Sequence, residues 1–531
     1  MHHLYRRHIL IKDFDVQSDA VVKLRMDAIR SEIQRYNPDV FIEFCMQYNL
    51  QKFDDNLHML RHMPWVVNLC LKWSASAIGK NKKFKNLNKM QAIALFQKAY
   101  DTLSIIPIGL EKKNGLDFFL RNNIYQQGIY QRIDALNSIS RQVFLFLPLE
   151  EKHKIKTSFL SLTNISIEDF LVLSFVLITH ITSNNPVRKM NVNTFDVLQP
   201  IISKETIERF LDAISITYER LPSFSKLKTH DKPLLEYYSS SPFLENPLIK
   251  KGSDYFQIHT QLTSTSIQTF IYDLLRRNDA EKFMDSFGKV FEDSLEKIIH
   301  ESTIPFFTEK YLKERLPKDN KVVDFLIPHS DANIFIDAKG VEIHEKGMVT
   351  LRPEDISGKI KTSVLKAIEQ AHEVNREIFL DDGRICAFRK ESYALCITYK
   401  NLFLGNGSFL ANAYASNEMQ KIYDKFSSDY HIPKENIFCL AFDEFEYLLA
   451  SCKYANVPPH MVLKYAVEKN KKPSSAAFLF AHHLRAFFDR VKNSDLVNEM
   501  GKKMVISISE KISPSNGDIS KKSGGTLAAE Q

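Results

Sequence analysis

Two aspartates and a lysine stand beside two short apolar runs near the middle of this 531-residue chain. The first run, residues 322–327, contains Asp324, and the second, residues 333–336, leads directly into Asp337 and then Lys339. Turn-forming residues separate the runs, so the sequence predicts two strands joined in a hairpin. Folding the hairpin about its midpoint places Asp324 directly opposite Asp337, with Cβ atoms roughly 4.5–5.5 Å apart. Side chains alternate along a strand, so Lys339 returns to the face of Asp337 and the three charged groups converge.

Such a group of side chains indicates a metal-assisted reaction. Two close carboxylates repel each other, and one of them takes up a proton unless a cation lies between them. Mg²⁺ is the expected cation, because it prefers oxygen ligands and typically takes one or two protein carboxylates while it keeps waters or phosphate oxygens. The ammonium of Lys339 can orient, or help to deprotonate, a water beside the phosphate. The pattern therefore predicts hydrolysis of phosphodiester bonds.

A helix is predicted just upstream, because apolar residues recur there at helical spacing. Its apolar face is expected to contain Phe283, Met284, Phe287, Val290, Phe291, Ser294, Leu295 and Ile298. Glu292 lies about 100° around the helix from Phe291, at the border of that face. Two interpretations of Glu292 stay open: an ordinary boundary glutamate, or a third carboxylate that faces the hairpin.

These residues resemble the active-site motif of the PD-(D/E)xK nuclease superfamily: Asp324 on one strand, Asp337-Ala338-Lys339 on the next, and Glu292 on the preceding helix. The resemblance implies that Asp324, Asp337 and Glu292 bind Mg²⁺, with the backbone carbonyl of Ala338 as a further ligand and Mn²⁺ as a substitute ion. It also implies that Lys339 serves the attacking water. Chance alone supplies several D/E-x-K tripeptides, and this one is distinguished by the apolar strands around it.

The resemblance covers residues 281–400 and implies an α/β fold. A further helix is predicted at 359–379 by its apolar spacing, and Gln370 borders its inner face. The resemblance implies that a glutamine at this place faces the catalytic site, although a surface glutamine fits the pattern equally well. Strands are predicted at 393–399 and 437–442. The expected fold class is an α/β restriction-endonuclease-like core, a mixed sheet flanked by helices, with a large mainly α-helical N-terminal region.

The length and composition predict a multidomain globular protein, since 44% of the residues are apolar and can form packed interiors. The expected parts are a mainly helical recognition or regulatory domain at 1–215, a connecting region with a small hairpin at 216–280, a nuclease domain at 281–455, a helical segment at 456–511 and a disordered tail at 512–531. In the first part, helices are predicted at 54–71, interrupted or kinked at Pro64, at 90–103 and at 117–138.

Several features predict a cytoplasmic protein without a membrane partner. The most apolar stretch, residues 170–178, is far shorter than the roughly 20 residues that span a bilayer, so it is expected to be a buried core helix. The start of the chain lacks the long apolar segment of a secretion signal. The six cysteines contain no C-x-x-C pair, which disfavours a zinc ribbon or an iron–sulfur site and suits reduced thiols.

The charge balance permits nucleic-acid binding. The chain carries a formal net charge of +7, which is mildly basic. Phosphate contacts are expected at Lys359 and Lys361, and at Lys82, Lys83 and Lys85 in a basic run that fits a solvated loop equally well. No P-loop motif occurs, so ATP-driven translocation would require a separate NTPase. A sensor protein and a homodimer are the other partners that we consider.

Three functional hypotheses follow. The leading one is an Mg²⁺-dependent endonuclease that cuts DNA, by analogy a restriction or anti-phage defence effector. The second is an RNA-cleaving nuclease with the same site, because attack on a phosphodiester does not by itself select the sugar. The third is a non-catalytic scaffold or nucleic-acid-binding protein with a disused nuclease fold. A disused site would have no reason to keep Asp324, Asp337 and Lys339 together, which argues against the third hypothesis.

Overall fold

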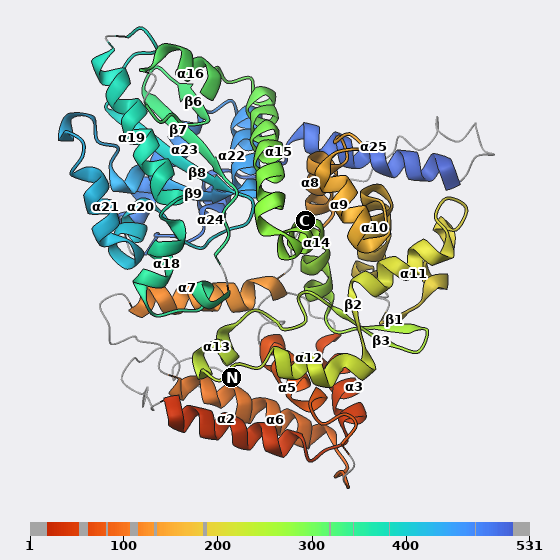
Figure 1. The fold of residues 1–531 in the computed structure, drawn as a ribbon. Coiled ribbons are helices and arrows are strands. Elements are labelled where there is room, and N and C mark those ends of the chain that lie inside the picture. The colour runs from red at the N-terminus through yellow and green to blue at the C-terminus, as the bar shows by residue number, and fades with distance from the viewer. Residues whose placement is uncertain are drawn as a thin grey trace.

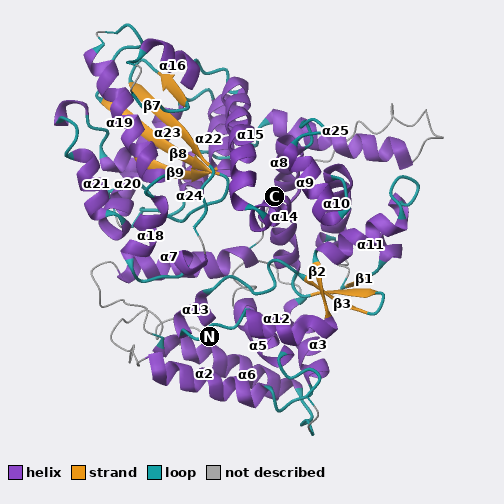
Figure 2. Ribbon diagram, viewed as in Figure 1, coloured by secondary structure: helices purple, strands orange, loops and turns teal. Residues whose placement is uncertain are grey.

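Helices dominate the protein, and two sheets lie between them (Figures 1 and 2). The computed structural model describes residues 19–51, 62–80, 83–106, 115–131, 135–183, 188–317, 320–343, 345–381, 383–472 and 474–512. The predicted tail from residue 513 onward, residues 54–61 of the first predicted helix and Lys82 lie outside these described residues.

The larger sheet has five strands in chain order. They are β5 (Phe307–Thr308), β6 (Phe325–Pro328), β7 (Ala332–Lys339), β8 (Glu391–Thr398) and β9 (Ile437–Ala441). The pairs β5–β6 and β6–β7 are antiparallel, whereas β7–β8 and β8–β9 are parallel. The fold is therefore mixed α/β, as predicted, with a mixed sheet between helices.

Side chains of this sheet alternate between two hydrophobic clusters. Ile334 and Ile336 join the cluster that contains α15 (Ala280–Glu301), whereas Phe335 joins the cluster that contains α19 (Val364–Leu380). Figure 1 shows α15 and α19 on opposite sides of the sheet. Burial on both faces explains why β7 reads as a continuous apolar run in the sequence.

The predicted hairpin register is confirmed. Phe325 pairs with Ile336 and Ile327 pairs with Ile334. If this register continues one residue before β6, Asp324 lies opposite Asp337. The first strand is shorter than predicted, since it begins at Phe325 rather than at residue 322. The backbone carbonyl of Val322 accepts a hydrogen bond from a side chain of α19 instead of from a strand.

The two helices around the hairpin differ in how closely they follow the prediction. In α15, the predicted apolar face is buried apart from Met284, which is half-buried. The helix predicted at 359–379 is instead two helices, α18 (Pro353–Ile360) and α19, separated by a turn. Ser363 has non-helical backbone angles, and its hydroxyl donates to the carbonyl of Ile360. Such local hydrogen bonds of serine compete with helix formation, which explains the break.

In the N-terminal part, the interruption predicted at Pro64 is observed, and one predicted helix needs correction. Pro64 begins α5 (Pro64–Ala75), because proline lacks the N–H that a first helical residue leaves unpaired anyway. The helix predicted at 117–138 is two helices, α7 (Gly115–Gln127) and α8 (Ala135–Phe146), with a 3₁₀ turn that starts at Gly128. Glycine weakens the helix at that point.

The remaining helices complete the fold. The one predicted at 90–103 is α6 (Lys89–Asp101), and the apolar stretch 170–178 lies within the largely buried α10 (Ile167–Thr182). Within the described ranges, the other α-helices of four residues or more are α2 (Asp19–Ile33), α3 (Pro38–Asn49), α9 (Lys154–Thr163), α11 (Lys204–Ala213), α12 (Leu221–Leu227), α13 (Pro233–Tyr238), α14 (Thr260–Asn278), α16 (Glu309–Arg315), α17 (Glu345–Met348), α21 (Ser416–Tyr423), α22 (Phe442–Ala455), α23 (Pro459–Asn470), α24 (Phe480–Phe487) and α25 (Asp495–Ile512).

A second, four-stranded sheet has the order β1-β4-β3-β2. Its strands are β1 (Lys189–Met190), β2 (Ser215–Thr217), β3 (Leu248–Lys251) and β4 (Asp254–Gln257). The antiparallel pair β3–β4 coincides with the predicted small hairpin, and Gly252 supplies the positive φ that its tight turn requires. Strands β1 and β2 were not predicted, because two or three residues are too few to show an alternating pattern.

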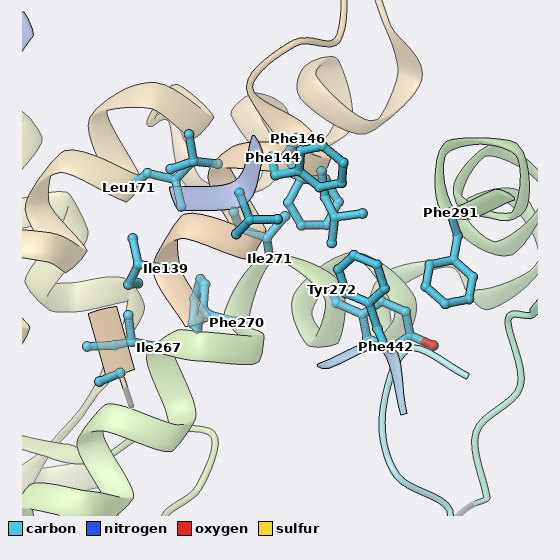
Figure 3. Close-up of a cluster of buried hydrophobic side chains, with 14 of the residues drawn as sticks. Ile139, Phe144, Phe146, Leu171, Ile267, Phe270, Ile271, Tyr272, Phe291 and Phe442 are labelled. Atoms are coloured by element: carbon cyan, nitrogen blue, oxygen red, sulfur yellow. The ribbon is translucent and has the colours of Figure 1, made fainter. Parts of the chain in front are cut away.

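Three hydrophobic clusters join segments that are distant in the sequence. Figure 3 shows Phe144 and Leu171 from the N-terminal part in one cluster with Tyr272, Phe291 and Phe442. These clusters cross the boundaries expected near residues 215 and 280, and the domain boundaries stay a prediction.

A buried arginine ties the N-terminal part to the chain that follows β7. Arg121 of α7 has no exposed surface, and its Nη1 donates to the backbone carbonyls of Gly347 at 3.0 Å and Met348 at 2.6 Å. Its guanidinium also lies 5.8 Å from the ring of Tyr414. The segment that leaves Lys339 is therefore held by a helix from the N-terminal part.

Among the described residues, no single helix is both long and apolar enough to cross a bilayer. The consecutive helices α9 and α10 together have sufficient length and apolar content, with a bend of 66° between them.

A buried histidine predicts how stability changes with pH. His259 caps α14, and its Nδ1 accepts from the N–H groups of Gln261 and Leu262. Burial lowers the pKa of His259 from 6.5 to about 3, so its neutral form stabilises the fold above pH 6.5 and that stabilisation is lost as the pH falls toward 3. We expect the free energy of unfolding to decrease over this range by at most about 1.4 kcal/mol per pH unit from this residue.

The variant His259→Asn tests this expectation. Asparagine keeps a helix-capping acceptor but does not titrate. Urea unfolding at a series of pH values should give a flatter pH dependence for the variant than for the wild type. Equal slopes would show that His259 does not control acid stability.

Candidate functional site

The carboxyl end of β7 brings the predicted residues together. Asp337 is 2% exposed, and its Oδ1 accepts a hydrogen bond from Nζ of Lys339 at 2.6 Å. Its Oδ2 is buried and has no hydrogen-bond partner among the described residues. A buried carboxylate oxygen without a donor is costly, so this atom is available for another ligand.

Asp324 faces the same place from the residue before β6. Its Oδ2 accepts from the backbone N–H of Ala338 at 2.6 Å, which fixes the carboxylate against β7. Burial and the charge of Asp337 raise the pKa of Asp324 to about 8. The two carboxylates therefore carry a full negative charge each at neutral pH only if a cation compensates them.

Lys339 and Gln370 are joined by a hydrogen bond beside the carboxylate of Asp337. Burial alone would lower the pKa of Lys339, but the charge and hydrogen bond of Asp337 raise the pKa above its ordinary value. Nζ of Lys339 also donates to Oε1 of Gln370 at 3.5 Å, and Nε2 of Gln370 donates to the carbonyl of Val322 at 2.5 Å. Gln370 is 8% exposed, so it is not a surface glutamine. It connects Lys339 to the chain just before Asp324.

Glu292 approaches the same group from α15. Burial raises the pKa of its carboxyl, the ion pair with Lys289 opposes this, and the charge of Asp324 adds to it. Its Oε1 lies 3.2 Å from Nζ of Lys289, and the side chain is 28% exposed. Glu292 is thus close enough to be affected by the charge of Asp324, but its partner is Lys289 and no hydrogen bond joins it to either aspartate among the described residues, so both interpretations stay open.

These side chains form a donor set that suits a hard divalent cation. Asp324 and Asp337 present two carboxylates, and Oδ2 of Asp337 accepts no hydrogen bond from an N–H or hydroxyl donor of the described residues, whereas Glu292 is not shown within ligand distance of both aspartates. Oxygen ligands at two or more carboxylates are what Mg²⁺ and Mn²⁺ prefer. The backbone N–H of Ala338 donates a hydrogen bond to Asp324. The expected role of the Ala338 carbonyl as a metal ligand stays a prediction.

The predicted phosphate contacts fall in two places. Lys359 and Lys361 are exposed at the end of α18 and in the turn before α19, the helix that carries Gln370. Lys83 and Lys85 are also exposed, but they precede α6, which Figure 1 shows at the opposite end of the molecule from β7. The structure therefore does not bring the basic run near the candidate site, and its role stays a prediction.

Sequence reasoning missed a ring of ion pairs just beyond the strand ends. Lys400, which follows β8, pairs with Asp273 of α14 and lies 3.5 Å from Glu342, which follows β7. Glu342 also pairs with Arg276 of α14. These four residues line a cavity of about 230 Å³ whose other walls come from α5, α13 and the loop at 239–242. Only the position of Lys400 and Glu342 after strands was visible in the sequence.

Comparison of this chain with protein-family models, with curated proteins and with solved structures gave no match.

Proposed function

We propose that this protein is an Mg²⁺-dependent nuclease that hydrolyses phosphodiester bonds, with DNA as the leading substrate. The observation that carries the proposal is the pair of buried carboxylates of Asp324 and Asp337 beside Lys339, in which Oδ2 of Asp337 accepts no hydrogen bond from an N–H or hydroxyl donor of the described residues. A non-catalytic fold would gain nothing from burying two carboxylates that repel each other.

The strand order supports the finer proposal of a restriction-endonuclease-like core. An antiparallel hairpin carries Asp324 and Asp337, and it continues into parallel strands with α15 on one face and α19 on the other. In this proposal, α15 delivers Glu292 and α19 delivers Gln370 to the end of β7. A role in restriction or anti-phage defence, a homodimeric assembly, and a separate NTPase or sensor partner stay hypotheses.

Each residue has a defined task in the proposed reaction. Asp324, Asp337 and Glu292 would hold Mg²⁺, which when bound supplies Lewis-acid activation of water and phosphate. In the absence of a metal, Asp337 raises the pKa of the Lys339 ammonium. Lys339 would orient the attacking water or help to deprotonate it, and its charge would stabilise negative charge on the phosphate. Gln370 positions Lys339 through the hydrogen bond to its ammonium.

Two exposed lysines near the candidate site support a nucleic-acid substrate. Lys359 and Lys361 are exposed next to α19, so they can contact phosphates on either side of the cleaved bond. The site itself does not distinguish DNA from RNA, and the choice of DNA is a prediction.

The proposal is tested by incubating the purified chain with supercoiled plasmid, linear duplex, single-stranded DNA and structured RNA. Each substrate is offered with Mg²⁺, Mn²⁺ or EDTA. We expect cleavage with either metal and none with EDTA. The substrate that is cut decides between the DNA and RNA alternatives.

The variant Lys339→Ala should cut about a hundredfold to a thousandfold more slowly, because removal of one group that stabilises developing charge has that effect in other enzymes. The matched control is Lys310→Ala, which removes an exposed lysine of α16. The initial rate of plasmid cleavage measures both variants. If Lys339→Ala cut at the wild-type rate while Lys310→Ala did so too, the assigned site would be wrong.

A further inference from the structure

Two histidines and an aspartate meet at the other end of the β6–β7 hairpin. His329 and Asp331 belong to the hairpin turn, and His460 belongs to the first turn of α23. The imidazole rings are 4.3 Å apart between centroids. Oδ2 of Asp331 lies 3.7 Å from Nδ1 of His329 and 3.9 Å from Nε2 of His460. One ligand atom from each of these three residues lies within 4.8 Å of the other two.

His460 lacks the partners that a buried histidine normally has. Its side chain is 4% exposed, and its Nδ1 is buried without a hydrogen-bond partner among the described residues. Its Nε2 is 3.9 Å from Asp331, which exceeds a hydrogen-bond distance. Nε2 of His460 therefore faces the carboxylate of Asp331 without a hydrogen bond and beside the ring of His329, as a metal ligand would, and Nδ1 of His329 accepts the N–H of Asp331 at 3.3 Å, a bond that a metal ion would replace.

We propose that His329, Asp331 and His460 bind one Zn²⁺ ion. Two imidazole nitrogens and a carboxylate oxygen are ligands that zinc takes, with a water completing four-coordination. Ligand atoms of such a site are about 3.3 Å apart, given bond lengths of about 2.0–2.2 Å and tetrahedral angles. Small side-chain rotations would shorten the observed separations of 3.7 and 3.9 Å to that value.

The surroundings allow the ion to enter and to be held. The side chain of Asp331 is 71% exposed and that of His329 is 32% exposed, so the site opens to solvent on one side. The backbone of the turn is fixed, since the N–H of His329 donates to the carbonyl of Ala332 at 2.9 Å. Nitrogen ligands favour zinc over magnesium, which separates this site from the carboxylates at the end of β7.

The zinc ion would join the hairpin turn to α23. The same hairpin carries Asp324 and Asp337 at its other end, so the ion would fix the strands that position them. This inference does not depend on the proposed nuclease activity.

The test is a titration of the full, untagged chain with Co²⁺, a spectroscopic substitute for zinc, in the presence of excess Mg²⁺. We expect a visible d–d absorption band that saturates at one equivalent and that disappears when Zn²⁺ is added. The variants His329→Ala and Asp331→Asn should weaken Co²⁺ binding at least tenfold. The control His482→Ala removes an exposed histidine of α24 and should bind like the wild type.

A further variant and a second measurement show whether the metal binds at this site. A chain with His2→Ala and His3→Ala should bind as the wild type does, which excludes the N-terminal histidines as the zinc ligands. The zinc-dependent rise in melting temperature should be present in the wild type and absent in His329→Ala. Binding of Co²⁺ by His329→Ala with wild-type affinity, or no binding by the wild type, would overturn the proposal whether or not the protein cuts nucleic acid.

Discussion

Asp337→Ala is expected to lower the rate of metal-dependent cleavage by about a thousandfold or more. Loss of a carboxylate ligand removes several kcal/mol of transition-state stabilisation, and each 1.4 kcal/mol corresponds to a factor of about ten in rate. The fold should remain intact, because the substitution also removes the repulsion between Asp337 and the neighbouring Asp324, whose pKa is raised to about 8.

Three measurements check this prediction. Initial rates of cleavage with Mg²⁺ give the loss of activity, and thermal unfolding without metal shows whether the variant is folded. The rise in melting temperature on adding Mn²⁺ should also disappear, since the variant no longer binds the ion tightly. Asp285→Ala, an exposed aspartate of α15, is the matched control and should retain all three wild-type properties. A folded Asp337→Ala variant that cuts at wild-type rates would show that the catalytic centre is not at Asp337.

Arg141→Met is expected to lower the free energy of unfolding by about 3–5 kcal/mol, because it leaves a buried charge without its partner. Nε of Arg141 in α8 donates to Oε2 of Glu446 in α22, and the two side chains are 9% and 0% exposed. Oε1 of Glu446 accepts from the N–H of Ser494 at 2.9 Å, so the carboxylate stays in place when Arg141 is lost. This pair joins the N-terminal part to the helices that follow β9.

Urea unfolding of the single and double variants separates the ion pair from general packing. The double variant Arg141→Met, Glu446→Gln should recover part of the lost stability, since it contains no uncompensated buried charge. Lys23→Met is the control: Lys23 pairs with Asp231 at an exposed site, and such pairs contribute less than about 1 kcal/mol. A loss for Arg141→Met as small as that for Lys23→Met would show that the buried pair is not important for stability.

The hairpin and the helix before it could be predicted because their information is local. The register of Phe325 with Ile336 follows from a turn between two apolar runs, and the face of α15 follows from the spacing of its apolar residues. The spacing placed Gln370 only at the border of the buried stripe of α19 and left its orientation open, and the structure buries it.

Features that depend on distant packing could not be predicted. His460 meets His329 only because α23 packs against the hairpin turn, and no spacing in the sequence relates the two residues. The break before α19 depends on a single hydroxyl of Ser363 within an otherwise continuous helical pattern. Strand β2 exists only because β3 lies beside it, since three residues carry no strand signal of their own.

The contact of Arg121 with Gly347 and Met348 limits how this protein can have been assembled in evolution. An exchangeable catalytic module needs a boundary that recombination can cross without loss, and a crossover near residue 280 would separate Arg121 from the carbonyls that it binds. A fully buried guanidinium left without acceptors would destabilise the recombinant that keeps Arg121. Because the acceptors are backbone carbonyls, the path of the chain at 347–348 is what such a crossover would have to preserve.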